Sequence, residues 1–227
     1  MNKIIYIGGG KGGVGKSKMA FALIDYFTDK GPLLLVETDT ANPDVFKAHA
    51  DDNLVVPKQA DLDTPEGWIE LVNLCDEYKQ YPVIINSAAR NEKGIRNYCD
   101  TLKGSMDELC REMMIFWMIN RQKDSLELLK SFMEYFKNTP LYVWRNLHFG
   151  EEEKFELYNS SNLKKQLESS GGMSKNFPGL ADRVADKLYS GRRSVKIALK
   201  ELPLGDKAEL KRWRIRYFKE LDGVQWT

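Results

Sequence analysis

The chain has 227 residues, of which 42% are hydrophobic and 30% are charged, with a formal net charge of +1. This composition is typical of a soluble globular protein with a single α/β domain, and it excludes a general electrostatic attraction to nucleic acid or anionic lipid. The three cysteines are far apart in sequence and there are only two histidines, which argues against a disulfide framework and against a zinc site.

Short apolar runs alternate with segments of helical periodicity over the first 146 residues. Strands are predicted at residues 3–8, 33–38, 82–87, 113–119 and 141–144. Helices are predicted at residues 16–29, 64–79, 93–110 and 124–136, the last one capped by Asp124 or Ser125. The apolar stretch at residues 4–7 is too short for a signal peptide or a membrane span, so we expect a cytoplasmic protein.

The pattern changes after residue 146, where most segments are charged and helical. Helices are predicted at residues 151–169, 179–191, 195–202 and 207–221, with a break at residues 171–172. Alternating strands and helices imply right-handed crossovers. We therefore expect an α/β fold with a mostly parallel twisted sheet, helices on both faces and a helical C-terminal extension.

A glycine-rich segment separates the first predicted strand from the first predicted helix. It matches the pattern G-x-x-x-x-G-K-[ST] and consists of Gly10, Lys11, Gly12, Gly13, Val14, Gly15, Lys16 and Ser17. Glycines allow successive main-chain N–H groups to point at phosphate oxygens, and the N-terminus of the following helix adds further donors. Lys16 can reach the β- and γ-phosphates and Ser17 can coordinate Mg²⁺. The sequence therefore predicts a site for a nucleoside triphosphate, ATP with Mg²⁺.

Residues 11–17 also resemble the deviant Walker A box of the ParA/MinD ATPases, which carry an extra lysine near the start of the loop. The resemblance covers residues 1–200, and residues 37–44 are similar to plasmid-borne and conjugation-associated members. It implies a P-loop ATPase domain at residues 1–205, with a basic amphipathic helix at residues 206–227 packed on it. It also implies that Lys11 crosses the interface of an ATP-dependent homodimer to contact the partner's nucleotide, which would couple hydrolysis to dimerisation.

Polar residues at other strand ends are further candidates, because ligands bind beyond the carboxyl ends of parallel strands. The resemblance implies that Asp39 positions or activates the attacking water and contacts Mg²⁺, directly or through water. It also places Asn86 where the family has its Walker B aspartate, and Glu37 where the family has another acid. An amide can bond a Mg²⁺-bound water but adds no negative charge. We therefore expect slow or partner-stimulated hydrolysis.

Two more residues complete the predicted nucleotide site. Lys18 stands where a small hydroxyl residue is usual in the family, and it either contacts the α-phosphate or projects into solvent. Asn146 follows a predicted strand that resembles the one whose asparagine contacts the base in this family, although a plain turn asparagine fits as well. Residues 177–180 resemble the loop that closes over the base.

The last predicted helix has an apolar stripe formed by Leu210, Trp213, Tyr217 and Leu221. The stripe is surrounded by Lys211, Arg212, Arg214, Arg216 and Lys219. Three interpretations compete: a docked helix with a solvated basic face, a non-specific DNA patch extended by Arg192, Arg193 and Lys196, and a membrane-surface helix. The acids Glu209, Glu220 and Asp222 make the membrane interpretation the weakest.

These features lead to one main hypothesis and two alternatives. The main hypothesis is a ParA/MinD-like ATPase whose nucleotide state controls a partner protein, and a DNA contact, in plasmid partition or conjugative transfer. A regulatory or scaffold protein that holds nucleotide without hydrolysis is the first alternative, and Asn86 motivates it. The second is a metabolic P-loop kinase, for which the sequence lacks a lid-like arginine cluster.

Overall fold

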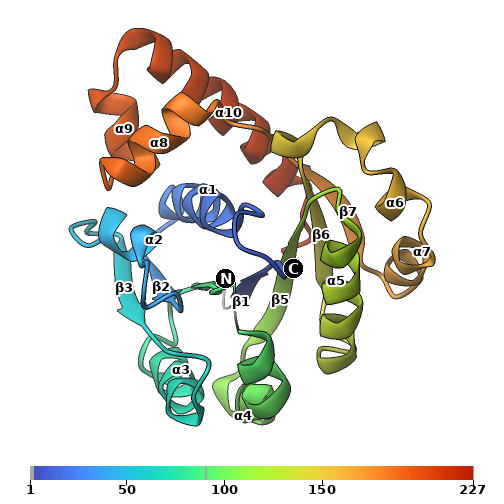
Figure 1. The fold of residues 1–227 in the computed structure, drawn as a ribbon. Helices are drawn as coiled ribbons and strands as arrows, with labels where there is room; N and C mark the ends of the chain where they lie inside the picture. Colours follow the sequence, from blue (N-terminus) through green and yellow to red (C-terminus); the bar gives the residue numbers. More distant parts are fainter. Residues whose placement is uncertain (1–2, 90, 227) are drawn as a thin grey trace.

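A seven-stranded sheet forms the centre of the computed structural model, which describes residues 3–89 and 91–226 (Figure 1). Its strands are β1 Lys3–Gly8, β2 Leu33–Glu37, β3 Val55–Gln59, β4 Val83–Asn86, β5 Glu112–Ile119, β6 Leu141–Asn146 and β7 Met173–Phe177. All neighbouring strands are parallel, in the order β3-β2-β4-β1-β5-β6-β7. Strand β1 therefore lies at the middle of the sheet, between β4 and β5, and the glycine-rich loop follows from its carboxyl end.

Helices cover both faces of this sheet (Figure 1). They are α1 Lys16–Thr28, α2 Asp44–Ala48, α3 Pro65–Glu77, α4 Glu92–Leu109, α5 Lys123–Tyr135, α6 Glu156–Asn159, α7 Asn162–Ser169, α8 Asp182–Ser190, α9 Val195–Glu201 and α10 Leu204–Asp222. Two short 3₁₀ helices span Leu147–Phe149 and Glu152–Lys154. Helices α1, α8, α9 and α10 lie on one face, and α3, α4 and α5 lie on the other. The predicted α/β class with a parallel sheet is confirmed.

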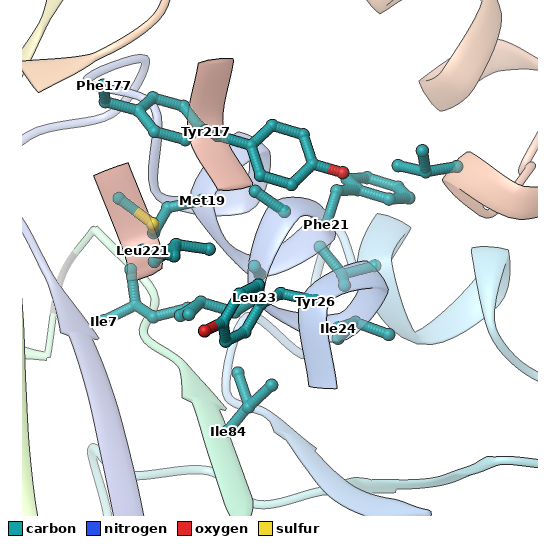
Figure 2. Packing of buried hydrophobic residues seen from close by; sticks show 14 of the residues in the cluster. Ile7, Met19, Phe21, Leu23, Ile24, Tyr26, Ile84, Phe177, Tyr217 and Leu221 are labelled. Carbon is teal, nitrogen blue, oxygen red and sulfur yellow. The ribbon is translucent and has the colours of Figure 1, made fainter. Parts of the chain in front are cut away.

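Alternating side chains of each strand feed two separate cores. In β1, Ile5 and Ile7 join the core around α1, whereas Ile4 and Tyr6 join the core beneath α3, α4 and α5. Figure 2 shows the first core, where Met19 and other side chains of α1 meet residues of the sheet and of α10. Because a strand buried on both faces needs apolar residues at every position, the runs predicted as strands are nearly free of polar residues.

Helix α10 packs along α1 through the apolar stripe predicted for it, and all four stripe residues are buried. The indole N–H of Trp213 donates to the Pro178 carbonyl at 2.9 Å. Arg214 forms ion pairs with Asp25 and with Asp29, both at 2.6 Å. Several cations of the predicted basic patch are therefore paired within the protein, and those left exposed on this helix are Lys211, Arg216 and Lys219.

Three elements differ from the sequence-based expectations because they are short or only partly buried. Strands β3 and β7 were not expected, since both lie at the edges of the sheet and are mostly half-exposed. Helix α2, with five residues, was not expected either. Strand β4, which ends at Asn86, is therefore the fourth strand in the chain and not the third.

Several predicted helix boundaries are wrong: α8 starts at Asp182 and α10 at Leu204, whereas starts at residues 179 and 207 were predicted. The continuous helix predicted at residues 151–169 is broken into one 3₁₀ turn, α6 and α7, because the Ser161 hydroxyl accepts a hydrogen bond from the Lys164 N–H and starts a new helix. Helix α5 starts at Lys123, after Gln122, so neither Asp124 nor Ser125 caps it. Within the described residues, no helix combines the length and apolar character required to cross a membrane.

Candidate functional site

The glycine-rich loop turns sharply between β1 and α1, and two of its glycines have left-handed backbone conformations. Gly13 has φ of 75° and Gly15 has φ of 108°. A Cβ atom on Gly15 would lie 2.5 Å from Nδ2 of Asn146, so no other residue fits there without a shift. Cβ atoms built on Gly12 and Gly13 would meet nothing within 4 Å. The loop thus leaves an open cradle above its main chain.

Lys16 is held inside this loop. Only 7% of the residue is exposed, and its ammonium donates to the main-chain carbonyls of Gly9 at 3.2 Å and Lys11 at 3.1 Å. Burial lowers the pKa of Lys16 to about 8, and the negative charges of Asp39 and Glu37 oppose that shift. Lys16 therefore remains mostly protonated at neutral pH, and it places a positive charge where an anion can reach it.

A cavity of about 440 Å³ lies next to the loop and gathers most of the predicted site residues. Those that line it are Gly12, Gly13, Gly15, Lys16, Ser17, Lys18, Asp39, Asn86 and Asn146. Gly10, Lys11 and Val14 do not line it. A Cβ on Gly10 would collide with the Leu128 side chain, and the Val14 side chain is buried in the core.

Lys11 points away from the cavity of its own chain. Its ammonium forms an ion pair with Asp124 near the start of α5 and lies 3.5 Å from Oε1 of Gln122. The hydrogen bond from Lys11 lowers the pKa of the Asp124 carboxyl. Both side chains are partly exposed, so solvent weakens this pair and it can open at small cost.

The Asn146 amide links the end of β6 to the loop. Its Nδ2 donates to the Val14 carbonyl at 2.8 Å, and its Oδ1 accepts from the His148 N–H at 3.1 Å. Both polar atoms of the amide are thus bonded to main chain. This arrangement anchors the loop against the neighbouring strand end, and the predicted contact with a base stays a prediction.

Three polar residues meet beside the loop at the ends of β2 and β4. Nδ2 of Asn86 lies 3.0 Å from each carboxylate oxygen of Glu37, and Oε1 of Glu37 also accepts from the Asp39 N–H at 3.1 Å. Burial raises the pKa of Glu37 to about 7, although the hydrogen bond from Asn86 opposes this shift. Oδ1 of Asn86 is buried and has no hydrogen-bond partner within the described part of the chain. Asp39 accepts from the Asn42 N–H at 3.0 Å.

The residues present fit a nucleotide with Mg²⁺. Ser17, Asp39 and Asn86 line one cavity together with Lys16, and the partnerless Asn86 oxygen is an acceptor still to be satisfied. Across residues 3–89 and 91–226, no group of three or more His, Cys, Asp or Glu side chains could hold a metal ion. This donor set suits Mg²⁺, because Mg²⁺ takes one or two protein ligands and fills its shell with phosphate oxygens and water.

The far wall of the cavity consists of residues that the motif analysis missed. One face of α8 contributes Asp182, Ala185, Asp186 and Tyr189, whose spacing of three, four and seven residues is that of one helical face. Burial lowers the pKa of Lys18, while Asp182 and Asp186 oppose the shift. Lys18 therefore faces this acidic wall across the cavity. Asp44, Ser87, Ala89 and His148 complete the lining.

Comparisons with known proteins agree with this geometry. No family model matches the sequence. The chain is 52% identical over 226 residues to Protein MobD of Acidithiobacillus ferrooxidans, with 99% of both chains covered.

Similar solved structures share the fold at low sequence identity. They include MinD complexed with Mg-ADP from Pyrococcus horikoshii, with a TM-score of 0.60, 16% identity and 98% of both chains covered. A putative plasmid partition protein of Borrelia burgdorferi bound to AMPPNP has a TM-score of 0.59 at 16% identity, covering 99% of this chain and all of that one. MinD of Aquifex aeolicus has a TM-score of 0.58 at 14% identity, with the same coverage. The chain therefore belongs to the MobD family, and its fold is that of the ParA/MinD ATPases.

Proposed function

We propose that this chain is a nucleotide-dependent switch that binds ATP with Mg²⁺ in the cavity beside the glycine-rich loop. The observation that carries the proposal is the Lys16 ammonium, which the carbonyls of Gly9 and Lys11 hold beneath an open glycine cradle. Lys16 would bind the β- and γ-phosphates, Ser17 would coordinate the metal, and Asp39 and Asn86 would bind water near it. When bound, Mg²⁺ neutralises charge on the phosphate oxygens.

The switch would act through an ATP-dependent homodimer and a partner protein. Lys11 belongs to this part of the proposal, because a cation that leaves its own cavity free can serve the nucleotide of a second copy. The ion pair with Asp124 would hold Lys11 until dimerisation. Similarity to MobD in sequence and to a plasmid partition protein in fold supports plasmid mobilisation or partition as the process.

Calorimetry tests nucleotide binding. The unsubstituted chain should release or absorb heat with AMPPNP and Mg²⁺, and Lys16→Ala should weaken binding about 100-fold because a charge-assisted contact to phosphate is lost. A folded Lys16→Ala protein with unchanged affinity would rule out this site. Circular dichroism on both proteins controls for unfolding.

Sedimentation tests the dimer. With ATP and Mg²⁺ the unsubstituted chain should sediment as a dimer, and Lys11→Ala should stay monomeric while it still binds nucleotide. Lys123→Ala is the matched control. Lys123 is an exposed lysine next to Asp124, and it forms its ion pair with Glu127. Normal dimerisation of Lys11→Ala would contradict the trans-acting role.

Asn86 supports a second candidate, a protein that holds nucleotide without turnover, since the amide brings no charge to the metal site. Phosphate release over time distinguishes the two. Slow release that Asp39→Ala abolishes would establish an ATPase in which Asp39 serves the attacking water. Release no faster than in buffer, with and without DNA or a partner, would favour the scaffold.

A further inference from the structure

Glu37 and Asn86 form a single hydrogen-bonded unit beneath the cavity. The parallel register of β2 and β4 sets the two residues side by side, with both side chains on the face that carries α1. Glu37 is 0% exposed and Asn86 is 3% exposed. The strand pairing, and not a flexible loop, therefore fixes their separation.

The carboxylate of Glu37 determines which way the Asn86 amide points. In its ionised form the Glu37 carboxylate only accepts hydrogen bonds, so it selects the orientation in which Nδ2 of Asn86 faces it. Nδ2 lies 3.0 Å from both carboxylate oxygens, and the Asp39 N–H occupies Oε1 as well. Oδ1 of Asn86 consequently points away from Glu37 and is left without a partner in the described structure.

Only one member of the unit reaches the cavity. Asn86 lines it, whereas Glu37 does not. The amide thus lies between the buried carboxyl group of Glu37 and the cavity, with Nδ2 toward Glu37 and Oδ1 on the side away from it. A buried, unsatisfied oxygen backed by a carboxylate is a strong acceptor for a donor that enters from the cavity.

From this arrangement we infer that Glu37 is a positioning residue, which orients and polarises Asn86 so that its Oδ1 accepts a hydrogen bond from water of the Mg²⁺ shell. The inference rests on the proposed function, because it needs a Mg²⁺–nucleotide in this cavity. Asn86 has no negative charge of its own. The ionised Glu37 carboxylate behind it then supplies that charge through the amide. Outer groups of this kind commonly determine metal affinity.

The inference also explains why an amide is suited to this position. An aspartate at position 86 would place two carboxylates in contact in a buried site, and two such groups cannot both ionise without a large cost. One carboxylate and one amide keep a single charge and a complete hydrogen bond between them. Exchanging the two groups should therefore preserve the unit, whereas changing either alone should damage it.

An exchange experiment tests this unit with four proteins: the unsubstituted chain, Glu37→Gln, Asn86→Asp and the double variant. AMPPNP affinity is measured with Mg²⁺ and with EDTA at about pH 8, above the pKa of Glu37. Glu37→Gln should lower the gain in affinity from Mg²⁺ about tenfold and leave affinity in EDTA unchanged. The double variant should recover to within about threefold of the unsubstituted chain, because it again has one carboxylate and one amide. Glu112→Gln, at the opposite end of the sheet, is the matched control and should change nothing.

Thermal unfolding without nucleotide provides a second readout. Asn86→Asp should unfold at lower temperature than the unsubstituted chain at neutral pH, and adding Glu37→Gln should restore it. Unchanged Mg²⁺ dependence in Glu37→Gln, or a double variant no better than Glu37→Gln alone, would overturn this inference and leave the proposed function intact. Absence of nucleotide binding by the unsubstituted chain would refute the proposed function and this inference together.

Discussion

At the N-terminal end of α1 the Lys16 ammonium donates to two main-chain carbonyls, whereas near the other end of the helix the Asp25 carboxylate is bonded by two side chains of α10. Oδ2 of Asp25 accepts from Arg214 at 2.6 Å and from the Tyr217 hydroxyl. Burial raises the pKa of Asp25, and the hydrogen bonds from Tyr217 and Arg214 oppose that shift. Helix α1 thus carries one buried charge that contacts main chain and another that is bonded by side chains of α10.

The difference separates a structural role from a functional one. Around Asp25, Arg214 ties α10 to α1 and also pairs with Asp29, so these charges hold two layers together. Beside Lys16 lies the cavity, and no acidic side chain among the described residues forms an ion pair with its ammonium. Removing one member of a buried ion pair is costly for the fold, whereas a charge left for a ligand is retained at some cost in stability.

The largest effect is expected from removing the cation that pairs with Asp25. Arg214→Met leaves the buried Asp25 charge without its cation, and should lower the free energy of unfolding by about 3–4 kcal/mol. Nucleotide affinity at the other end should not change. Chemical denaturation measures the first quantity and calorimetry the second. Lys103→Met removes a solvent-exposed pair with Asp100 and should cost less than about 1 kcal/mol, so an equal loss in both variants would argue against the distinction.

The second-largest effect is expected from a substitution in the strained backbone of the glycine-rich loop. Gly15→Ala forces a side chain into a left-handed conformation and against Asn146, at a cost of about 2–3 kcal/mol in unfolding free energy. Gly12→Ala is the matched control, because a Cβ there meets open space. It should leave stability unchanged and weaken AMPPNP binding about tenfold by filling the cradle. Equal stability of the two variants would show that the loop tolerates rearrangement.

Measuring the free energy of unfolding as a function of pH should reveal what it costs to ionise the buried Glu37. Its pKa is about 7 in the folded protein and near 4.5 otherwise, so the folded state binds more protons between these values. The stabilisation that protonated Glu37 contributes is fully present below its pKa in the unfolded chain. It is lost as pH rises through its pKa in the folded protein. Relative to Glu37→Gln, the unsubstituted chain should lose about 2 kcal/mol between about pH 5 and pH 7. Parallel pH profiles of the two proteins would contradict the raised pKa.

The smallest effect is expected for the exposed pair of Lys11 and Asp124. Asp124→Asn removes a partner that must be given up before Lys11 can cross to a second chain. ATP-dependent dimerisation should tighten about threefold, because exposed ion pairs are weak. Sedimentation over a range of protein concentrations measures the change. Weaker dimerisation would mean that Asp124 takes part in the dimer contact itself.

Sequence patterns predict the centre of this fold well and its edges poorly. The five predicted strands are the buried ones, because burial on both faces requires continuous apolar runs such as the one in β4. The edge strands β3 and β7 contain Pro57 and Lys175, and they pair on one side only, so their sequences carry little strand signal. Helix α7 starts at Asn162 and is capped by Ser161, a local signal that a long charged segment conceals.

Prediction of the site likewise succeeds for a contiguous motif and fails for contacts between distant segments. The glycine-rich loop is a contiguous motif whose spacing carries its chemistry, and most of its residues line the cavity. The direction of Lys11 depends on Asp124, a tertiary neighbour, and no spacing reveals it. The pairing of Glu37 with Asn86 could have been inferred once β2 and β4 were aligned by their apolar runs. The acidic face of α8 was visible as a helical repeat, but nothing local assigns it to the cavity.

The cavity is lined by segments that are far apart in sequence, among them the glycine-rich loop, the ends of β2, β4 and β6, and α8. A chain cut before Asp182 would lose this part of the lining together with α9 and α10, and with them the core residues that pack against α1. The glycine-rich loop near the start of the chain therefore depends on helices that come from its end.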